Sequence, residues 1–320
     1  MKNYDIQIIV TGASGYVGEY LLPSLYKKYL NIVPVDLIKS KYVLKTSNIC
    51  DKDLIDKLNI DTVKDTIIIN LASARFDFGV KANDYLNSNV ISQKIFLENI
   101  DSLNIIKFIH ISSVAAIEGA KIQFNKNLNC DNAYRSTKYM QGELIKEWCI
   151  KKNIDYSILY PSAIFSNHAR KDTNIGKLQN LSKFIPFVPA INVQKSLTYL
   201  PNFCNFIIQS TQNKRYIGEY LTIEKPVLTV SEIASCLITN KTKVLTIPYL
   251  KFIMYALAYL LYIIGGFGMV DMKLTPNRVK KLFSDTQYNH ITGLELDKSS
   301  YNLKYNTELM EILKKIGTKR

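Results

Sequence analysis

The residues best suited to acid–base chemistry are Tyr134 and Lys138, which lie four positions apart. On a helix this spacing places both side chains on one face. A lysine ammonium beside a phenol favours the phenolate and lowers the tyrosine pKa, so Tyr134 could exchange a proton with a substrate hydroxyl. Ser113 closes an apolar run twenty-one residues before Tyr134, and its hydroxyl could hold the same substrate oxygen. We therefore expect Tyr134, Lys138 and Ser113 to be catalytic, with the neighbouring Ser112 as the alternative serine.

A second group of residues is suited to binding a dinucleotide. The glycines of the segment Thr-Gly-Ala-Ser-Gly-Tyr-Val-Gly, at positions 12, 15 and 18, come directly after the first apolar run. A turn of this kind between a strand and a helix lets the backbone approach a pyrophosphate and directs the helix N-terminus at it. Asp36 ends the second apolar run, where a carboxylate accepts hydrogen bonds from the ribose 2′-OH and repels a 2′-phosphate. These features predict NAD as the cofactor in preference to NADP, unless Asp36 only caps a turn.

Apolar runs and helical patterns alternate along the first half of the chain, and these elements must position the residues above. The runs are short and nearly continuous in isoleucine and valine, which is typical of strands in a parallel sheet covered on both faces. The expected strands are residues 6–10, 32–36, 66–71, 106–112 and 155–160, and the expected helices are residues 15–29, 51–58, 83–102 and 134–151. The pattern predicts an α/β fold with a doubly wound parallel sheet.

The rhythm changes after the fifth expected strand, so we expect a domain boundary there. Residues 1–165 are expected to form an NAD-binding Rossmann domain, to which residues 216–223 return one strand. Residues 166–320 are expected to form a smaller, mainly helical, substrate-binding part. Within it, Thr229 and Glu232 have the spacing of a capping box, which predicts that a helix begins there.

One long uncharged segment, residues 252–270, requires a comparison with membrane helices. Glycines interrupt its second half, which leaves about thirteen helical residues, too few to cross ~30 Å of hydrocarbon at about 1.5 Å per residue. Lys251, Tyr255, Tyr259 and Tyr262 fall on one face at helical spacing and give it a weakly polar stripe. We expect a helix that packs against the protein or forms a dimer contact. Contact with a membrane surface is the alternative and is not the expectation.

Composition excludes several classes of protein. The 320-residue chain is 47% hydrophobic and 21% charged, which is typical of a folded globular protein. Its net charge of +14, from 41 basic and 27 acidic residues, comes almost entirely from scattered lysines, so no nucleic-acid partner is expected. Five dispersed cysteines and three histidines predict neither a disulfide scaffold nor a metal site. Residues 1–10 have no signal-peptide pattern, and we expect a cytoplasmic protein.

Together the glycine-rich segment and the Tyr–Lys helix resemble the extended short-chain dehydrogenase/reductase family, and within it the nucleotide-sugar epimerases and dehydratases. The segment at 11–18 is similar to the family's TGxxGxxG motif, and residues 133–143 are similar to its YxxSK helix. The resemblance covers residues 1–165 well and the rest loosely. It implies NAD as cofactor, a nucleotide diphosphate sugar as substrate, a role in polysaccharide biosynthesis and a homodimer that pairs through the helices at 83–102 and 134–151.

The resemblance also implies which residues contact the cofactor. Asn48 and Ile49 would lie at the adenine, and Arg75 would reach the pyrophosphate. Asn89 matches the asparagine of an Asn-Val pair in the family's long helix. The complete implied set is Gly12, Gly15, Tyr16, Val17, Gly18, Asp36, Asn48, Ile49, Leu71, Ala72, Arg75, Asn89, Tyr134, Lys138 and Pro161.

Substrate contacts are implied at Ser113, Asn174, Lys195 and Arg278. Lys195 begins a segment whose family counterpart contacts a nucleotide diphosphate. The guanidinium of Arg278 is suited to bidentate phosphate binding. The segment at the end of the fifth expected strand departs from the family pattern, since Tyr160 stands where arginine is usual.

The resemblance implies an NAD-dependent enzyme that transfers a hydride at a sugar hydroxyl or keto carbon, and C4 epimerisation is the leading hypothesis. A 4-keto nucleotide-sugar reductase using NAD(P)H is the first alternative. An enzyme similar to 3β-hydroxysteroid dehydrogenases and a non-catalytic NAD-binding protein follow. Dehydration is disfavoured, because Ser113 is followed by Val-Ala-Ala where dehydratases of the family carry additional acid and base groups.

Overall fold

The computed structural model describes residues 3–75, 79–166, 175–176, 187–213, 215–225, 227–237, 244–264, 276–286 and 308–318. The chain divides into two units. The first contains the described residues up to Ile164 together with the described part of Thr198–Ile223. The second contains the described parts of Phe165–Leu197 and of the chain from Glu224 onward.

Near-continuous runs of isoleucine and valine become the strands of a six-stranded sheet in the first unit. The strands are β1 (Asn3–Thr11), β2 (Tyr29–Val35), β3 (Asp65–Asn70), β4 (Ile105–Ile111), β5 (Asp155–Pro161) and β10 (Gly218–Thr222). Their order is β10-β5-β4-β3-β1-β2, and every neighbouring pair is parallel. The predicted doubly wound parallel sheet is confirmed. The direction of winding reverses between β1 and β3, and in folds of this kind ligands bind where the carboxyl ends of two such strands separate.

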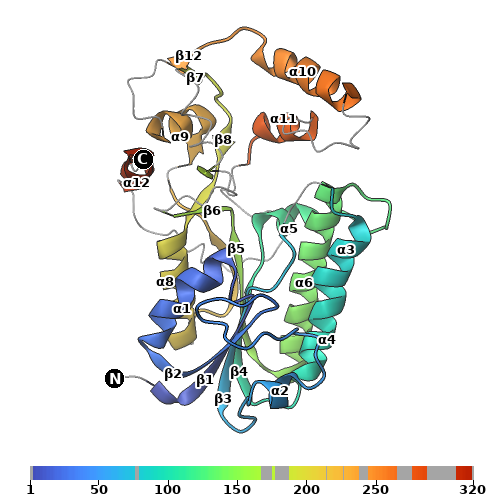
Figure 1. Ribbon diagram of the computed structural model, residues 1–320, viewed down its shortest axis with the longest axis vertical. Helices are drawn as coiled ribbons and strands as arrows, with labels where there is room; N and C mark the ends of the chain where they lie inside the picture. The colour runs from blue at the N-terminus through green and yellow to red at the C-terminus, as the bar shows by residue number, and fades with distance from the viewer. Residues whose placement is uncertain are drawn as a thin grey trace. The chain divides into compact units, whose positions relative to one another are not determined.

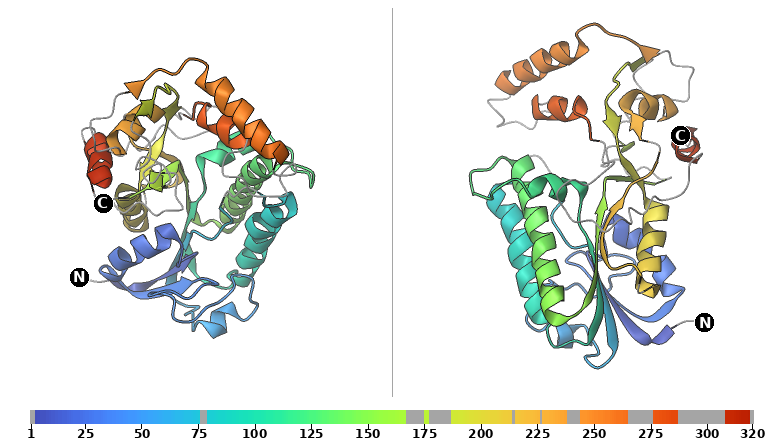
Figure 2. Two further views of the ribbon diagram at one scale, coloured as in Figure 1. Left: turned by 45° about the horizontal axis from the view of Figure 1, so that its top comes forward. Right: turned by 180° about the vertical axis from the view of Figure 1, so that it is seen from behind.

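Helices cover both faces of this sheet, as Figure 1 shows and as the rear view in Figure 2 repeats. One face carries α1 (Tyr16–Tyr26) and α8 (Leu200–Gln212), and the other carries α4 (Ser92–Asn99) and α6 (Cys130–Lys152). Alternate residues of a strand point to opposite faces. Ile8 and Val10 accordingly pack in the core with α1 and α8, whereas Ile9 packs in the core with α4 and α6.

Shorter helical segments connect the strands of the first unit. They are α2 (Leu54–Lys57), α3 (Ala82–Leu86), the π-helical turn η1 (Asn87–Ile91) and α5 (Val114–Gly119). The single helix predicted over residues 83–102 is therefore α3, η1 and α4 in succession. The π turn contains the buried Asn89, and π turns are frequent at functional sites.

The second unit consists of short strands and helices. In its described part, β8 (Gln194–Lys195) pairs antiparallel with β11 (Leu228–Thr229), and β7 (Val188–Pro189) pairs parallel with β12 (Val244–Leu245). A separate pair, formed by β6 (Ala163–Phe165) and β9 (Leu197–Tyr199), has most of its residues in the first unit. The helices are α9 (Val230–Leu237), α10 (Leu250–Ile264), α11 (Pro276–Leu282) and α12 (Glu308–Thr318).

The capping box predicted at the start of α9 is confirmed. The Glu232 carboxylate accepts a hydrogen bond of 2.7 Å from the Thr229 N–H, and Thr229 Oγ1 accepts one of 3.2 Å from the Glu232 N–H. These two bonds satisfy N–H groups that the start of a helix otherwise leaves without partners.

The described part of the uncharged segment, residues 252–264, belongs to α10. This helix is less completely packed than we predicted. Ala258 is fully buried, and Tyr255 and Tyr262 of the expected polar stripe are half-buried. Large apolar side chains such as Phe252 and Ile264 are instead exposed. Within the ranges that the structure describes, no helix has both the length and the apolar content needed to cross a membrane.

The end of β1 closely approaches the residues that follow β3, and Gly12 is the point of contact. Gly12 has a φ of +66°, in the left-handed region that favours glycine. A Cβ atom there would lie 2.8 Å from both the Leu71 carbonyl carbon and the Ala72 nitrogen. Gly142, inside α6, differs, because the space around its Cβ position contains no atom of another element within 4 Å.

The variants G12A and G142A should therefore change stability in opposite directions. We expect G12A to lower the free energy of unfolding by about 2 kcal/mol or more, because the backbone must shift and alanine is strained at a positive φ. We expect G142A to raise it by up to about 1 kcal/mol, because alanine favours the helix more than glycine does. Chemical denaturation followed by circular dichroism measures both values. Equal stability of the two variants would contradict the close approach of β1 and β3.

Candidate active site

The glycine-rich turn joins β1 to α1 at the point where the winding of the sheet reverses. Gly15 precedes α1 and has no side chain, so no capping side chain competes with an anion for the N–H groups of the first turn. These N–H groups and the positive end of the helix dipole fit the pyrophosphate of a dinucleotide. The structure thus places Gly12, Gly15 and the start of α1, with Tyr16, Val17 and Gly18, on one turn.

Asp36 follows β2 and lies beside the same turn. One carboxylate oxygen accepts a hydrogen bond of 2.9 Å from the Ser14 N–H, and the other accepts one of 3.1 Å from the Ile38 N–H. Asp36 therefore caps a turn, which was the alternative to a role in favouring NAD. A carboxylate has about four acceptor positions, so these bonds leave capacity for a ribose hydroxyl. The preference for NAD over NADP at Asp36 stays a prediction.

The residues after β3 approach the turn from the other side. The Leu71 N–H donates to the Thr11 carbonyl oxygen at 3.1 Å, and the Ala72 N–H donates to Thr11 Oγ1 at 3.3 Å. Leu71 and Ala72 are thereby held against the end of β1. Arg75 lies in the same loop with its side chain exposed. These expected cofactor residues therefore gather at the carboxyl ends of β1 and β3.

The two residues expected at the adenine lie in the loop that leads from β2 to α2. The Asn48 amide oxygen accepts a hydrogen bond of 3.0 Å from the Cys50 N–H. The Ile49 carbonyl oxygen accepts one of 2.9 Å from Asn99 Nδ2, at the end of α4. Both residues are thus held by the chain itself, and their contact with the adenine stays a prediction.

Asn89 is completely buried and joins two parts of the site. Its Oδ1 accepts a hydrogen bond of 2.8 Å from the Ala74 N–H, and its Nδ2 donates one of 3.1 Å to Thr137 Oγ1. The loop after β3 is thereby fixed to α6 at the residue before Lys138. In this structure Asn89 positions the residues around it.

Tyr134 and Ser113 are brought together by α6 and the start of α5. Ser113 caps the N-terminus of α5, and its Oγ accepts a hydrogen bond of 3.2 Å from the Ala115 N–H. The Ser113 side chain also lies close to Tyr134 and acts to lower the pKa of its phenol. The ring of Tyr85 packs edge-on against Tyr134, with 5.6 Å between the ring centroids. The Ser112 hydroxyl is buried without a hydrogen-bond partner among the described residues, so Ser113 is the serine next to the tyrosine.

The protein raises the pKa of Tyr134 to about 12, whereas the sequence predicted a lowered value. The main cause is loss of water around the hydroxyl, and the neighbouring Ser113 side chain acts in the opposite direction. The Lys138 ammonium donates its hydrogen bonds to other acceptors and none to Tyr134 among the described residues. In the chain alone, Tyr134 is therefore a neutral phenol at pH 7.

Lys138 lies one helical turn from Tyr134 and is 1% exposed. Its ammonium donates to Gln141 Oε1 at 2.8 Å, to Ser73 Oγ at 3.1 Å and to the Ile111 carbonyl oxygen at 3.3 Å. An ammonium group has three donors, so each donor has an acceptor. Burial nevertheless lowers the pKa of Lys138 to about 7. The charge of this lysine therefore changes near neutral pH.

Gln141 belongs to a buried polar network that sequence analysis did not identify. Its Nε2 donates to the Ala72 carbonyl oxygen at 3.2 Å and to Gln93 Oε1 at 3.3 Å. Gln93 Oε1 also accepts a hydrogen bond of 2.7 Å from Asn70 Nδ2. Asn70 Oδ1 in turn accepts one of 2.6 Å from Thr11 Oγ1. The network therefore connects the end of β1 with the buried lysine.

A signal for this network is present in the sequence. Gln141 lies four residues after Thr137 and four before Ile145, so it occupies the buried face of an amphipathic helix. A polar side chain on such a face needs hydrogen-bond partners. His110 joins the same network, with its Nδ1 3.2 Å from Asn70 Nδ2. Burial holds the pKa of His110 well below its ordinary value, so the ring is neutral.

Pro161 and Tyr160 end β5, next to the edge strand β10. The Tyr160 hydroxyl donates a hydrogen bond of 2.5 Å to Glu219 Oε2. The other Glu219 oxygen accepts one of 2.8 Å from Lys146 on α6. Tyr160, which stands where the family usually has arginine, therefore joins β5 to β10 and to the helix behind them.

Three expected substrate residues follow residue 165: Asn174, Lys195 and Arg278. The structure describes the side chain of Lys195 alone among them. Lys195 on β8 donates to the carbonyl oxygens of Lys281, at 2.8 Å, and Ser284. It therefore holds the C-terminal end of α11, where exposed carbonyls attract a cation. Arg278 belongs to α11, but its side chain lies outside the described residues, as does the whole of Asn174. Substrate contacts at these three positions stay predictions.

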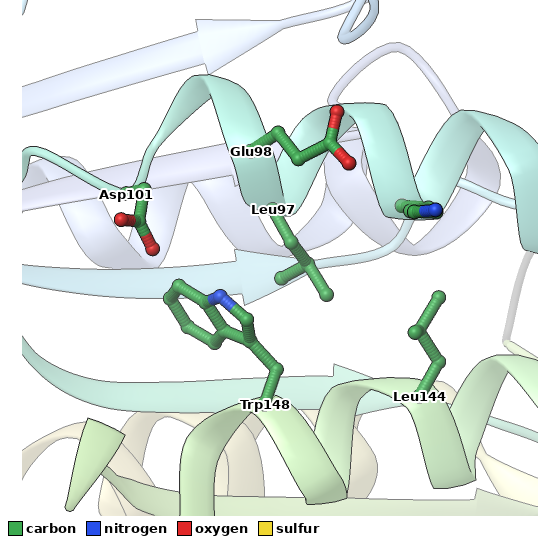
Figure 3. Close-up of a pocket in the computed structure, with 6 residues that line it drawn as sticks. Leu97, Glu98, Asp101, Leu144 and Trp148 are labelled. Carbon is green, nitrogen blue, oxygen red and sulfur yellow. The ribbon is translucent and has the colours of Figure 1, made fainter. Parts of the chain in front are cut away.

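A surface hollow of about 400 Å³ lies between α4 and α6. Its lining combines apolar and charged side chains from the two helices: Lys94, Leu97, Glu98, Asp101, Leu144 and Trp148. Figure 3 shows Trp148 and Leu144 pointing from α6 toward α4, where Leu97 lies. None of the expected catalytic or cofactor residues lines this hollow, so it is a feature of the outer helical layer.

Comparison of the sequence with known proteins finds a matching family model and relatives. A model of the NAD-dependent epimerase/dehydratase family matches residues 8–199. The chain is 28% identical over 232 residues to a CDP-abequose synthase of Yersinia pseudotuberculosis, a match that covers 69% of this chain and 79% of that protein. It is 27% identical over 229 residues to a UDP-glucose 4-epimerase of Yersinia enterocolitica. That match covers 61% of this chain and 65% of the other protein, just under two thirds of its length.

The fold is similar to that of a UDP-glucuronic acid 4-epimerase from Bacillus cereus, whose crystal structure contains NAD. The TM-score is 0.60 at 19% sequence identity. The match covers 74% of this chain and 84% of the other. At this identity the likeness concerns the fold alone.

Burial of Lys138 should make folding stability depend on pH. Its pKa falls from 10.5 to about 7 on folding, so between these values the unfolded chain binds more protons and stability rises with pH. Between pH 7 and pH 9 the wild type should gain up to about 2 kcal/mol relative to K138M. Urea unfolding of both proteins at the two pH values, without added nucleotide, measures this difference. Parallel behaviour of the two proteins would mean that the lysine keeps its ordinary pKa.

Proposed function

The chain belongs to the NAD-dependent epimerase/dehydratase family, and on that premise we propose that it is a 4-epimerase of a nucleotide diphosphate sugar. It is an NAD-dependent enzyme of the extended short-chain dehydrogenase/reductase type. The proposal rests on one observation above all, the placement of Tyr134 beside the Ser113 side chain and one helical turn from a buried lysine. The two relatives named for reactions of nucleotide-linked sugars support the substrate class.

In this proposal Tyr134 removes the proton of the sugar hydroxyl. Bound NAD⁺ supplies the hydride acceptor and a positive charge near the phenol, which favours the phenolate. Ser113 acts in the same direction: its Oγ already accepts from the Ala115 N–H, so its own hydrogen is directed to the Tyr134 oxygen or to the substrate oxygen. Loss of the hydroxyl proton to Tyr134 and of a hydride from C4 would leave a 4-keto sugar. The epimer would form when the hydride returns to the opposite face of C4 and Tyr134 returns the proton to the oxygen.

Lys138 contributes a positive charge whose place is fixed. The ammonium form favours a phenolate one helical turn away, and the neutral amine does not. Gln141 supports the ammonium form, because its Oε1 accepts the shortest of the three lysine hydrogen bonds. Gln141 is therefore a positioning residue for the lysine.

We also propose that the layer formed by α4 and α6 pairs two copies of the chain. The hollow between these helices presents Leu144 and Trp148 at the surface. Ile91 in η1, directly before α4, and Ile150 on α6 are also exposed. Apolar and aromatic surface of this kind is typical of the interface of a homodimer.

The nucleotide released from the protein should distinguish the candidate reactions. We expect near-stoichiometric NAD when protein purified without added nucleotide is denatured, because an epimerase recycles its cofactor within each turnover. Chromatography of the released nucleotide measures this. Release of NADP would contradict the role given to Asp36. A protein that is empty but binds NADH would favour a 4-keto sugar reductase.

The variant Y134F should keep the cofactor and lose the reaction. The NAD-loaded wild type should convert one of UDP-, CDP- or dTDP-glucose to the corresponding galactose compound, and Y134F should do so about 10²- to 10⁴-fold more slowly. Y139F is the matched control, since Tyr139 lies on the same helix and outside the site, and it should keep nearly the wild-type rate. If Y134F and Y139F were equally active, Tyr134 would not be the base.

Gln141 should control the pH dependence of the same reaction. Q141L removes an acceptor that favours the ammonium, so the loss of activity at high pH should begin about one pH unit lower than in the wild type. Q141E keeps the acceptor and adds a negative charge, so the loss should begin at a higher pH. A purely structural role would lower kcat in both variants without moving the profile in opposite directions.

A further inference from the structure

The side of α10 that faces away from Ala258 is apolar along its whole length. Six large side chains on it, each between 48% and 70% exposed, recur at a spacing of three to four residues and form one stripe, the outer face: Phe252, Ile253, Leu257, Leu260, Ile263 and Ile264. The opposite side of the helix packs, with Ala258 fully buried. Within the part of the chain that the structure describes, no element covers the outer face.

The segment of the sequence that contains this helix has an excess of basic over acidic residues. Residues 241–285 contain seven lysine or arginine residues and two aspartates, a net of +5 in a chain whose total is +14. Lys251, in the first turn of α10, is exposed. Helix α11 lies beside α10 in both ribbon views and carries Lys280 and Lys281 in its last turn. The outer face is therefore an apolar surface in a positively charged part of the chain.

The dimensions of α10 favour a position along a membrane surface. Its 15 residues extend for about 22 Å at about 1.5 Å per residue, less than the ~30 Å thickness of the hydrocarbon. A helix of this length lies in the plane of the interface, with its apolar face at the boundary between headgroups and acyl chains. Each nearby lysine or arginine strengthens binding to an anionic leaflet by roughly fivefold.

We propose that α10 binds the surface of a bilayer rich in anionic phospholipid and places its outer face among the lipid acyl chains. The charge of the surrounding segment distinguishes this partner from a second copy of the chain. An anionic bilayer attracts a segment of charge +5, whereas a second copy would bring an equal positive charge against it. The proposal is independent of the sugar chemistry proposed above.

Flotation with lipid vesicles tests the proposal. Vesicles of phosphatidylcholine and phosphatidylglycerol (7:3) should carry the wild-type protein at least tenfold better than vesicles of phosphatidylcholine alone. L257E/L260E should reduce this binding at least tenfold. The matched control is L44E/V63E, which replaces two exposed apolar residues of the first unit and changes the net charge equally. It should bind nearly as well as the wild type.

Fluorescence gives a second measurement that does not depend on the double variant. The wild type contains one tryptophan, Trp148 on α6, which sets the background. The added tryptophan of F252W should be quenched by vesicles containing brominated acyl chains, while Trp148 in the wild type should not. The proposal is overturned if the wild type does not float with anionic vesicles, or if both double variants lose binding equally. It is also overturned if sedimentation shows a dimer that only L257E/L260E dissociates, without any vesicle binding, since a second copy would then cover the outer face.

Discussion

The burial of one ammonium group, that of Lys138, constrains much of the first unit. A buried charge without partners costs several kcal/mol, so the lysine is tolerated only where each donor finds an acceptor. Its acceptors come from the loop after β3, from β4 and from α6 itself. The contact of Gly12 with the residues after β3, and the hydrogen bond from Ala74 to Asn89, keep that loop in place. Sheet, loop and helix must therefore fit together within a few tenths of an ångström at this one residue.

Burial shifts the pKa values of the two titrating groups of α6 in opposite directions, and both shifts favour the neutral form of the group. It raises the pKa of Tyr134 and lowers that of Lys138, so each group is shifted toward its neutral form. The chain alone therefore holds a phenol and a lysine close to its neutral state. The positively charged nicotinamide ring of a bound dinucleotide would favour the phenolate. In the proposed mechanism, this dependence connects acid–base chemistry to occupation of the nucleotide site.

Features with a local signal could be predicted from the sequence. Runs of isoleucine and valine predicted the parallel strands, because a strand buried on both faces is apolar throughout. The capping box of Thr229 and Glu232 was predictable because both partners lie within four residues. Features that depend on long-range placement were not. The burial of Tyr134 depends on how α6 packs in the folded unit, so the sign of its pKa shift could not be predicted from the spacing of four between Tyr134 and Lys138. Lys195 was assigned by resemblance, and the structure shows that carbonyl oxygens near the end of α11 occupy its ammonium.

The parallel topology of the first unit also affects how the chain folds during synthesis. Each parallel pair needs a crossover, so residues far apart in the chain must meet: Thr11 with Asn70, Asn70 with Gln93, and Gln93 with Gln141. Folds dominated by such non-local contacts form slowly, because long loops must close before their contacts are gained. A nascent chain that has emerged only as far as residue 130 contains the glycine-rich turn but lacks both Tyr134 and the glutamine that supports Lys138. Nucleotide bound to the completed unit would stabilise the folded chain against the unfolded one, which makes the cofactor a late partner in folding as well as in chemistry.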